Sequence, residues 1–413
     1  MKYYRLSENK SGKIIVGLLL FALLYLTRTG LTASALVGIN RAQFLTLGII
    51  CAVGVLFLVR NRDQWKELLL DKRMLLGIVC AVVLLLPAVL KRDFQMMYLS
   101  VLLCVMIGIF LSYFVSLKDA AKYYVLFLTM LAVWSVLAAY ILRRLPDNGI
   151  VSVPIFFTSR KVEFYNFGLS YVARFYVKNR NFGIFREPGV YQFFIMLALF
   201  LNNYTVQWKK QSTMWVINVI LAVTMLTTLA TGGVAELGLF VILVFFEKKL
   251  YKNKMAIITA VIVVVGMVAG LAVICMQKGE LYWELYGMVI AKIFGGEASS
   301  TDRLNALLVD LAYFRSNPLL GEQIATVLTA VEHNTASTML MLAMFGIGGG
   351  ALHIAAWAAL VWDRKRNAVA NVVLLIIMLL SVNTQNFVAD QFFWLFPMMA
   401  LTEKCVPLLE KKV

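Results

Sequence analysis

The sequence predicts an all-α polytopic membrane protein with about twelve transmembrane helices and two long segments on the outer face. Three observations predict this class. Of 413 residues, 61% are hydrophobic and only 15% are charged, so a soluble fold would expose too much apolar surface. Apolar runs long enough to cross a bilayer recur along the whole chain. Basic residues also gather in alternate connections between these runs.

A transmembrane helix needs about 20 apolar residues to cross the hydrocarbon layer. Two of the segments share the long run 213–247, which we divide at Thr231-Gly232-Gly233 because glycines favour a break. All the segments belong to one helical domain, residues 1–413. The predicted spans are 13–32, 43–59, 74–90, 95–117, 121–142, 189–206, 213–230, 232–247, 255–275, 336–361, 368–385 and 390–408.

The net charge of +17 is explained by topology rather than by nucleic-acid binding. With the N-terminus inside, most Lys and Arg residues fall in inner segments. The short outer loops hold only Arg28, Arg41, Lys91 and Arg92. The positive-inside rule therefore predicts a multi-pass protein of a plasma membrane with both termini in the cytoplasm. We expect no cleavable signal peptide, because the first apolar run lacks a small-residue cleavage site.

Two long outer segments, 143–188 and 276–335, hold most of the remaining charge. In the second, 281–296 is aromatic and amphipathic and suits the lipid interface. Residues 299–321 follow as a predicted helix that Asn317-Pro318 stops and Gly321 turns. Its apolar stripe comprises Leu304, Leu307, Leu308, Leu311 and Phe314.

We expect neither a metal ion nor another cofactor. The chain has only two histidines, and the first outer loop, 28–43, contains no Asp or Glu. The five cysteines are scattered and odd in number, which indicates small apolar residues rather than metal ligands or disulfides. If the protein binds a diphosphate, arginines must hold it, because their planar fork matches phosphate oxygens.

Arg186 is the best-placed arginine. It precedes Pro188-Gly189 at the outer end of the sixth span, where the helix N-terminus also favours an anion. The alternative is that Arg186 pairs with Glu187 or reaches lipid headgroups. Arg180 is a second candidate in the same segment. Arg303, in the first turn of the 299–321 helix, is a third, with pairing to Asp302 as its alternative.

His333 lies where the chain re-enters the membrane, between Glu332 and Asn334. A histidine can accept a proton from a sugar hydroxyl near neutral pH, although a capping role is the alternative. Glu236 lies at membrane depth and could bind a sugar hydroxyl or neutralise an arginine. For His353 we expect a packed hydrogen bond between helices, and for the GIGGG run 346–350 close helix packing.

Three stretches together resemble the bacterial O-antigen polymerase and O-antigen ligase superfamily. They are NRNFGIFREPGVYQFF (179–194), TDRLNALLVDLAYFRSNPLLGEQ (301–323) and EHNTASTMLMLAMFGIGGG (332–350). The TGGVAELG stretch departs from the pattern of many relatives, which carry a Ser-Arg-Gly-like segment there.

The resemblance implies metal-independent glycosyl transfer on the outer face of the bacterial plasma membrane, with a glycan on undecaprenyl diphosphate as donor. Arg186 and Arg303 would hold the donor diphosphate and His333 would assist the acceptor hydroxyl. Arg180, Glu187, Glu332, Asn334 and Glu236 are the expected substrate-binding residues. Partners would be the lipid-linked oligosaccharide, membrane lipids, and a chain-length regulator and flippase of the same pathway, but no nucleic acid.

The acceptor decides between two enzymes. A polymerase, which we favour, would extend a capsule or exopolysaccharide by one lipid-linked repeat unit, whereas a ligase would transfer the finished glycan to a lipid or surface anchor. A flippase or other transporter would place charges deep within several spans and keep its loops short. A non-enzymatic scaffold would not depend on Arg186 or His333.

Overall fold

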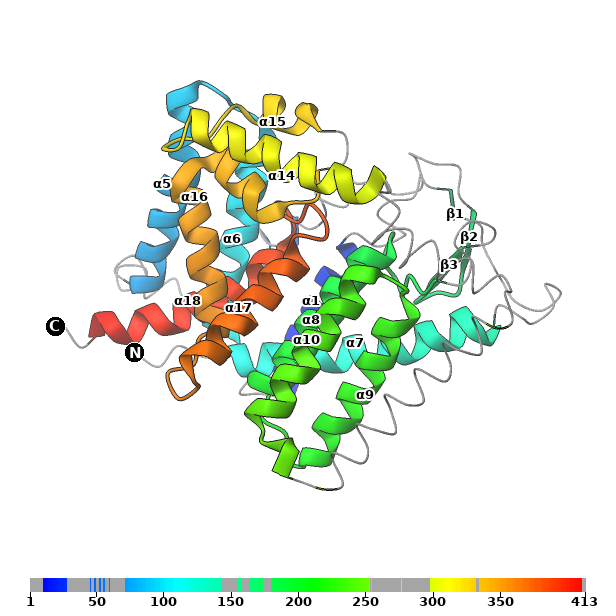
Figure 1. Ribbon diagram of the computed structural model, residues 1–413. Helices are drawn as coiled ribbons and strands as arrows, with labels where there is room; N and C mark the ends of the chain where they lie inside the picture. The colour runs from blue at the N-terminus through cyan, green and yellow to red at the C-terminus, as the bar shows by residue number, and fades with distance from the viewer. Residues whose placement is uncertain are drawn as a thin grey trace.

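The computed structural model describes residues 10–27, 71–142, 155–156, 163–173, 180–252, 298–331 and 334–410, with a few isolated positions between them. Within these residues it has twelve α-helices and three short strands (Figure 1). The predicted spans 43–59 and 255–275, the segment 281–296, and the pair Glu332 and His333 lie outside the described residues.

Helices account for nearly all the regular structure. Every predicted span that falls within the described residues coincides with a helix, and α14 and α15 belong to the second outer segment. The helices are α1 (Lys10–Leu26), α5 (Lys72–Lys91), α6 (Met96–Phe114), α7 (Leu117–Tyr140), α8 (Pro188–Tyr204), α9 (Gln211–Thr227), α10 (Thr231–Glu247), α14 (Ala298–Ser316), α15 (Ile324–Ala330), α16 (Ser337–Val361), α17 (Ala368–Val382) and α18 (Gln391–Glu410).

Four of these helices, α5, α6, α7 and α16, are long and apolar enough to cross a membrane by length and composition. Three shorter apolar helices lie at Lys13–Leu26, Gln211–Thr227 and Ala368–Val382. The described part of the chain therefore indicates a multi-pass membrane protein, but by these criteria it does not have the twelve spans that hydropathy predicted.

The first outer segment contains a small antiparallel sheet that the sequence analysis did not predict. Its strands are β1 (Ile155–Phe156), β2 (Glu163–Asn166) and β3 (Tyr171–Ala173), in the order β1-β2-β3. Gly168, at φ 76°, makes the turn between β2 and β3. The indole of Trp134 in α7 donates to the carbonyl of Phe167 at 2.9 Å, so this turn rests on the end of α7.

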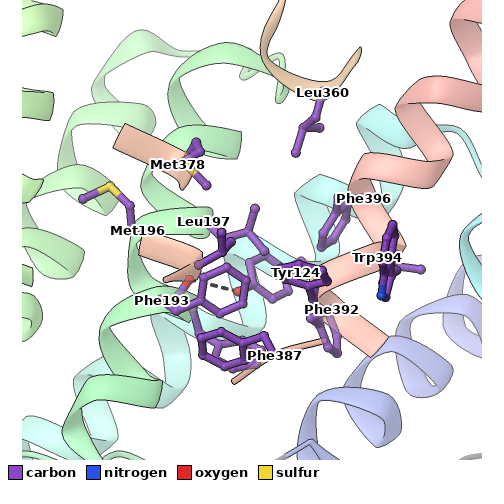
Figure 2. Close-up of a cluster of buried hydrophobic side chains, with 14 of the residues drawn as sticks. Tyr124, Phe193, Met196, Leu197, Leu360, Met378, Phe387, Phe392, Trp394 and Phe396 are labelled. Atoms are coloured by element: carbon purple, nitrogen blue, oxygen red, sulfur yellow. Dashed lines mark hydrogen bonds between the residues drawn. The ribbon is translucent and has the colours of Figure 1, made fainter. Parts of the chain in front are cut away.

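Helix α8 forms the centre of the bundle. Every residue from Val190 to Asn202 is buried, and α7, α9, α10 and α17 pack around it. Figure 2 shows the aromatic cluster on one side of this helix, where the ring of Phe193 lies 4.4 Å from that of Phe387. The hydroxyl of Tyr124 donates to the carbonyl of Phe194 at 2.9 Å and so ties α7 to α8. The residues just before α8 are therefore attached to a buried, closely packed helix.

Helix α16 is two helices rather than one. At Gly346 the backbone reaches φ 63° and ψ −161°, a conformation essentially confined to glycine. Thr338 and His353 would be about 22 Å apart along a straight helix, yet the Thr338 hydroxyl lies 3.2 Å from His353 Nε2. The residues of the predicted span 336–361 therefore do not form one straight helix, and the chain folds back on itself at Gly346.

The glycine run allows the two halves of α16 to touch. A Cβ at Gly349 would lie 2.3 Å from the Cβ of Phe345, and one at Gly350 would lie 2.2 Å from Leu342 Cδ2. These clashes confirm the prediction that the GIGGG run serves close helix packing. The prediction of a packed hydrogen bond for His353 is also confirmed, and its ring stacks on Phe393 at 4.8 Å.

Helix α14 ends where predicted, at Ser316, and Gly321 turns the chain at φ 69°. The predicted apolar stripe does not face the core, however. Leu304 and Leu308 are 58% and 52% exposed, whereas Ala306 and Asp310 are fully buried. Helix α14 instead presents this small and acidic face to α16, against which it packs extensively.

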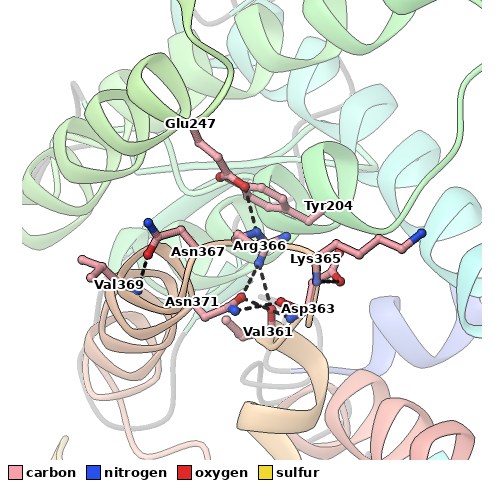
Figure 3. A network of polar contacts seen from close by, with 9 residues as sticks. All are labelled: Tyr204, Glu247, Val361, Asp363, Lys365, Arg366, Asn367, Val369 and Asn371. Atoms are coloured by element: carbon pink, nitrogen blue, oxygen red, sulfur yellow. Dashed lines mark hydrogen bonds and ion pairs between the residues drawn. The ribbon is translucent and has the colours of Figure 1, made fainter.

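Basic residues from described segments that were predicted to be inner lie at one end of the bundle. Figure 3 shows Arg366 there, where its Nε lies 2.8 Å from Glu247 Oε1 and its guanidinium stacks on Tyr204 at 4.2 Å. At the same end the Lys122 ammonium lies over the Trp208 ring, at 5.7 Å. The opposite ends of α8, α10, α16 and α17 carry the candidate site.

Candidate functional site

The segment before α8 is held in place by Asn181, which is 1% exposed. Its amide nitrogen Nδ2 donates to the hydroxyls of Ser135 and Thr227, both at 3.0 Å, and its backbone N–H donates to the Thr227 carbonyl at 2.9 Å. Its side-chain oxygen accepts from the backbone N–H of Gly183 at 2.9 Å. One asparagine thereby fastens residues 181–183 to α7 and α9.

Arg186 lies at the mouth of α8, with its side chain 26% exposed. Its Nε is buried and has no hydrogen-bond partner among the described residues. The acidic group beside it is Glu187, whose Oε1 lies 3.9 Å from this nitrogen, beyond hydrogen-bond distance. The predicted alternative, an ion pair with Glu187, is thus present only as a loose contact, and the guanidinium keeps donor capacity.

The first turn of α8 adds positive potential at the same place. Pro188 occupies its first position, and Glu187 is the N-cap residue but makes no side-chain capping bond. The dipole of a helix favours an anion near its N-terminus. The Glu187 carboxylate is instead engaged across the bundle, where its Oε2 accepts from Gln385 Nε2 at 2.8 Å.

Arg180 has a different environment. Its Nε donates to the carbonyl of Thr228 at 3.1 Å, at the C-terminal end of α9. A cation there complements the negative end of the helix. This contact commits the Nε of Arg180 to the scaffold, and its substrate role stays a prediction.

Glu236 projects from α10 toward α8 and is 5% exposed. Its Oε1 accepts from Gln192 Nε2 at 3.3 Å. Gln192 comes close because α10 begins with glycines: a Cβ at Gly232 would lie 3.2 Å from Gln192 Nε2, and one at Gly233 would lie 3.0 Å from Gln192 Oε1. The TGG sequence, which the hydropathy pattern marks as a break between spans, is therefore also a point of close approach.

The polar stretch 383–387 contacts both the 179–194 and the 332–350 stretches. The Ser337 hydroxyl donates to the Gln385 carbonyl at 2.5 Å and accepts from the Phe387 N–H at 2.8 Å. The N–H of Thr338 donates to Asn383 Oδ1 at 2.8 Å. With the bond from Gln385 to Glu187, this stretch connects the start of α16 to the start of α8. Sequence analysis missed it, although a run of Asn, Thr and Gln between two apolar spans was a visible signal.

Asn334 contacts a carboxylate that was not predicted. Its Nδ2 donates to both oxygens of Asp310, at 2.8 and 2.9 Å, and its Oδ1 accepts from the N–H of Ala336 at 3.0 Å. Burial raises the pKa of Asp310 to about 6, and the bond from Asn334 opposes that rise. The residue before Asn334 in the sequence is His333, so Asp310 anchors the segment that carries the predicted base.

The described part of the structure brings together only some of the predicted site residues. Arg186, Glu187 and Asn334 belong to one connected region, through Gln385 and Ser337. Arg303 lies on α14, seven positions before Asp310, but its side chain is outside the described residues, as are Glu332 and His333. Among the side chains that are described, no group of three His, Cys, Asp or Glu residues could hold a metal ion.

Comparisons with protein-family models, with curated proteins and with solved structures found no match to this chain.

Proposed function

We propose that this protein polymerises lipid-linked oligosaccharide repeat units into a surface polysaccharide on the outer face of a bacterial plasma membrane. The donor would be a glycan on undecaprenyl diphosphate and the acceptor a second lipid-linked unit. The observation that carries the proposal is Arg186, whose Nε is buried at the mouth of α8 without a hydrogen-bond partner among the described residues. The three-motif resemblance supplies the class of substrate.

The chemistry explains why such an arginine matters. The acceptor hydroxyl oxygen forms a bond to the anomeric carbon of the donor, while the bond from that carbon to the diphosphate oxygen breaks. The bonding electrons leave with the diphosphate, and a fixed cation stabilises the charge that develops there. The acceptor proton passes to a base, for which His333 is our candidate. Arg303, on the helix that also carries Asp310, would be a second cation for the diphosphate.

The arrangement of the bundle supports an outer-face site. Among the described residues, Arg366 and Lys122 of the segments predicted to be inner lie at one end of the bundle, and Arg186 belongs to the opposite end of α8. We infer that the shorter helices α8, α9, α10 and α17 cross the membrane together with α5, α6 and α7, since the termini of the shorter helices lie at these same two ends. A diphosphate at Arg186 would then sit near the headgroups while its polyprenyl tail stays in the lipid.

The test is the size distribution of surface polysaccharide in the producing bacterium. The gene is deleted and then complemented with wild type, Arg186→Ala, Arg186→Lys or Arg315→Ala. Arg315 is an exposed arginine of α14 to which we assign no role and serves as the matched control. We expect single repeat units in the deletion strain, and a ladder restored by wild type and Arg315→Ala. Both Arg186 variants should fail, because lysine cannot reproduce the planar fork of arginine.

Other outcomes identify other functions, provided that each variant is present in the membrane at the wild-type level. Long polymer that stays on its lipid carrier in the deletion strain would indicate a ligase. Absence of repeat units from the outer face would indicate a flippase. A ladder restored by Arg186→Lys would reduce Arg186 to a lipid-headgroup contact. An unchanged ladder in the deletion strain would overturn the proposed function.

A further inference from the structure

The carboxylate of Glu187 lies between two competing donors. Its Oε2 accepts from Gln385 Nε2 at 2.8 Å, which is a normal hydrogen-bond length. Its Oε1 lies 3.9 Å from Arg186 Nε, a distance that allows attraction but no hydrogen bond. The neutral amide thus holds the acid more closely than the adjacent guanidinium does.

We propose that Gln385 is a positioning residue, which holds the Glu187 carboxylate off Arg186 and so keeps that guanidinium available to an anionic ligand of the diphosphate class. This inference rests on the proposed function, because it assumes that Arg186 binds such an anion. It adds a residue that sequence analysis did not identify, and it assigns Glu187 a role in tuning Arg186 rather than in contacting sugar.

Gln385 is itself held rigidly enough for this role. Its backbone carbonyl accepts from the Ser337 hydroxyl at 2.5 Å, and Phe387, two residues on, donates to the same hydroxyl at 2.8 Å. The adjacent Thr384 hydroxyl donates to the Gly189 carbonyl at 3.4 Å. The stretch 383–387 is therefore tied to the starts of both α16 and α8.

Gly189 leaves room for the amide. A Cβ at this position would lie 3.3 Å from Gln385 Nε2, closer than most side chains approach. Pro188-Gly189 thus has a second use beyond forming the turn. It lets a side chain from the α17–α18 connection reach Glu187 across the first turn of α8.

Removing the side-chain amide of Gln385 should allow the Glu187 carboxylate to move toward Arg186. Without Gln385 the Glu187 carboxylate loses its 2.8 Å donor, and Arg186 is the cation already beside it. A charge-assisted bond between them would form and would compete with any anion for the guanidinium. A neutral residue at position 187 cannot form that bond. The effects of Gln385→Ala and Glu187→Gln on anion binding should therefore not be additive.

The experiment measures binding of inorganic pyrophosphate to the full-length protein in lipid nanodiscs by isothermal titration calorimetry. The variants are Arg186→Ala, Gln385→Ala, Glu187→Gln and the double variant Glu187→Gln/Gln385→Ala. Gln323→Ala is the matched control, since Gln323 makes no side-chain capping bond at the start of α15. Elution volume and melting temperature check that each variant is folded.

We expect Gln385→Ala to weaken pyrophosphate binding by about threefold to tenfold, the scale of one ordinary hydrogen bond. The double variant should bind within about twofold of Glu187→Gln, since its acid is absent. A double variant as weak as Gln385→Ala would overturn the inference and make Gln385 a loop anchor only. Unchanged binding by Gln385→Ala would overturn it as well.

The same measurements distinguish failure of the proposed function from failure of the role assigned to Gln385. If Arg186→Ala binds pyrophosphate as wild type does, Arg186 is not the anion site, whatever the Gln385 variants show. If wild type does not bind pyrophosphate, the anion site and the role of Gln385 are both overturned. If Arg186→Ala abolishes binding while Gln385→Ala leaves it intact, the site stands and only the role of Gln385 is lost.

Discussion

At the scale of single residues, the site depends on side chains that hold other side chains. Asn181 satisfies its donors and acceptor on α7, α9 and Gly183, and so fixes the segment that ends in Arg186. Asp310 does the same for Asn334. Buried polar groups of this kind are costly unless paired, so each pairing specifies one position of its segment.

Asp310 makes the contact of α14 with Asn334 sensitive to pH. Its pKa rises from 3.8 to about 6 on folding, so the folded protein binds this proton more tightly than the unfolded chain. Stability from this group is fully present below pH 3.8 and is lost as pH rises through 6, on the order of 3 kcal/mol. We expect amide exchange in α14, corrected for the intrinsic rate, to quicken between pH 5 and pH 7.5, as measured by mass spectrometry.

Asp310→Asn is the control for this pH effect. An asparagine can still accept from Asn334 but does not titrate in this range. The corrected exchange of α14 should then be the same at both pH values. A pH dependence that persists in Asp310→Asn would assign the effect to another group and would contradict the prediction.

At the scale of elements, the hairpin of α16 is the feature with the largest consequence. It turns what hydropathy describes as one span into a short helix that contacts Asn383 and a longer one that ends at Val361. A Cβ at Gly346 would lie 2.3 Å from the Leu319 carbonyl oxygen, so the tip is also pressed against the turn after α14. The hairpin of the 332–350 stretch thereby supports the turn near the end of the 301–323 stretch.

Gly346→Ala should therefore be strongly destabilising. The φ of 63° costs an alanine about 1–3 kcal/mol, and the contact with Leu319 involves backbone that cannot rotate away. We expect a fall of several degrees in the melting temperature of the purified protein in detergent. Gly238→Ala in α10 is the matched control, because a Cβ there would have nothing within 4 Å and alanine favours a helix. An equal loss in both variants would contradict this account.

At the scale of the whole molecule, the two ends of the bundle have different characters. The end with Arg366 joins α8, α10, α16 and α17 through Tyr204, Glu247, Val361 and Asn371 (Figure 3). The end with Arg186 leaves a buried guanidinium nitrogen without a hydrogen-bond partner among the described residues. A saturated network suits a structural role, whereas an unsatisfied cation suits ligand binding.

Arg366→Ala should cost about 2–4 kcal/mol of stability, because it leaves Glu247 without its cation at a partly buried position. Arg364→Ala, which removes an exposed arginine two residues away, should change stability by about 0.5 kcal/mol or less. Denaturation of the two purified variants in matched detergent measures the difference. Equal stabilities would show that the Arg366 network does not hold the four helices together.

The positions of the helices and the grouping of basic residues were predictable from the sequence alone. Both depend on local composition, since a bilayer demands an apolar run and the inner surface favours Lys and Arg. The predicted segment for α8 began at 189, one residue after its observed start at Pro188. The motif before it also marked Arg186 correctly as a residue at a helix mouth. These features need no knowledge of what lies across the bundle.

Only the tertiary structure decided which side chains meet. Gln385 reaches Glu187 across 198 positions, and Asn334 reaches Asp310 across 24. Nothing in the stretch 336–361 showed that the chain would fold back at Gly346, because its apolar pattern suits one straight span equally well. Such contacts depend on how buried faces pack, and packing involves residues far apart in sequence. The local pattern therefore identified the cation at the mouth of α8, and the packing of the bundle determined that its neighbouring acid is held away from it.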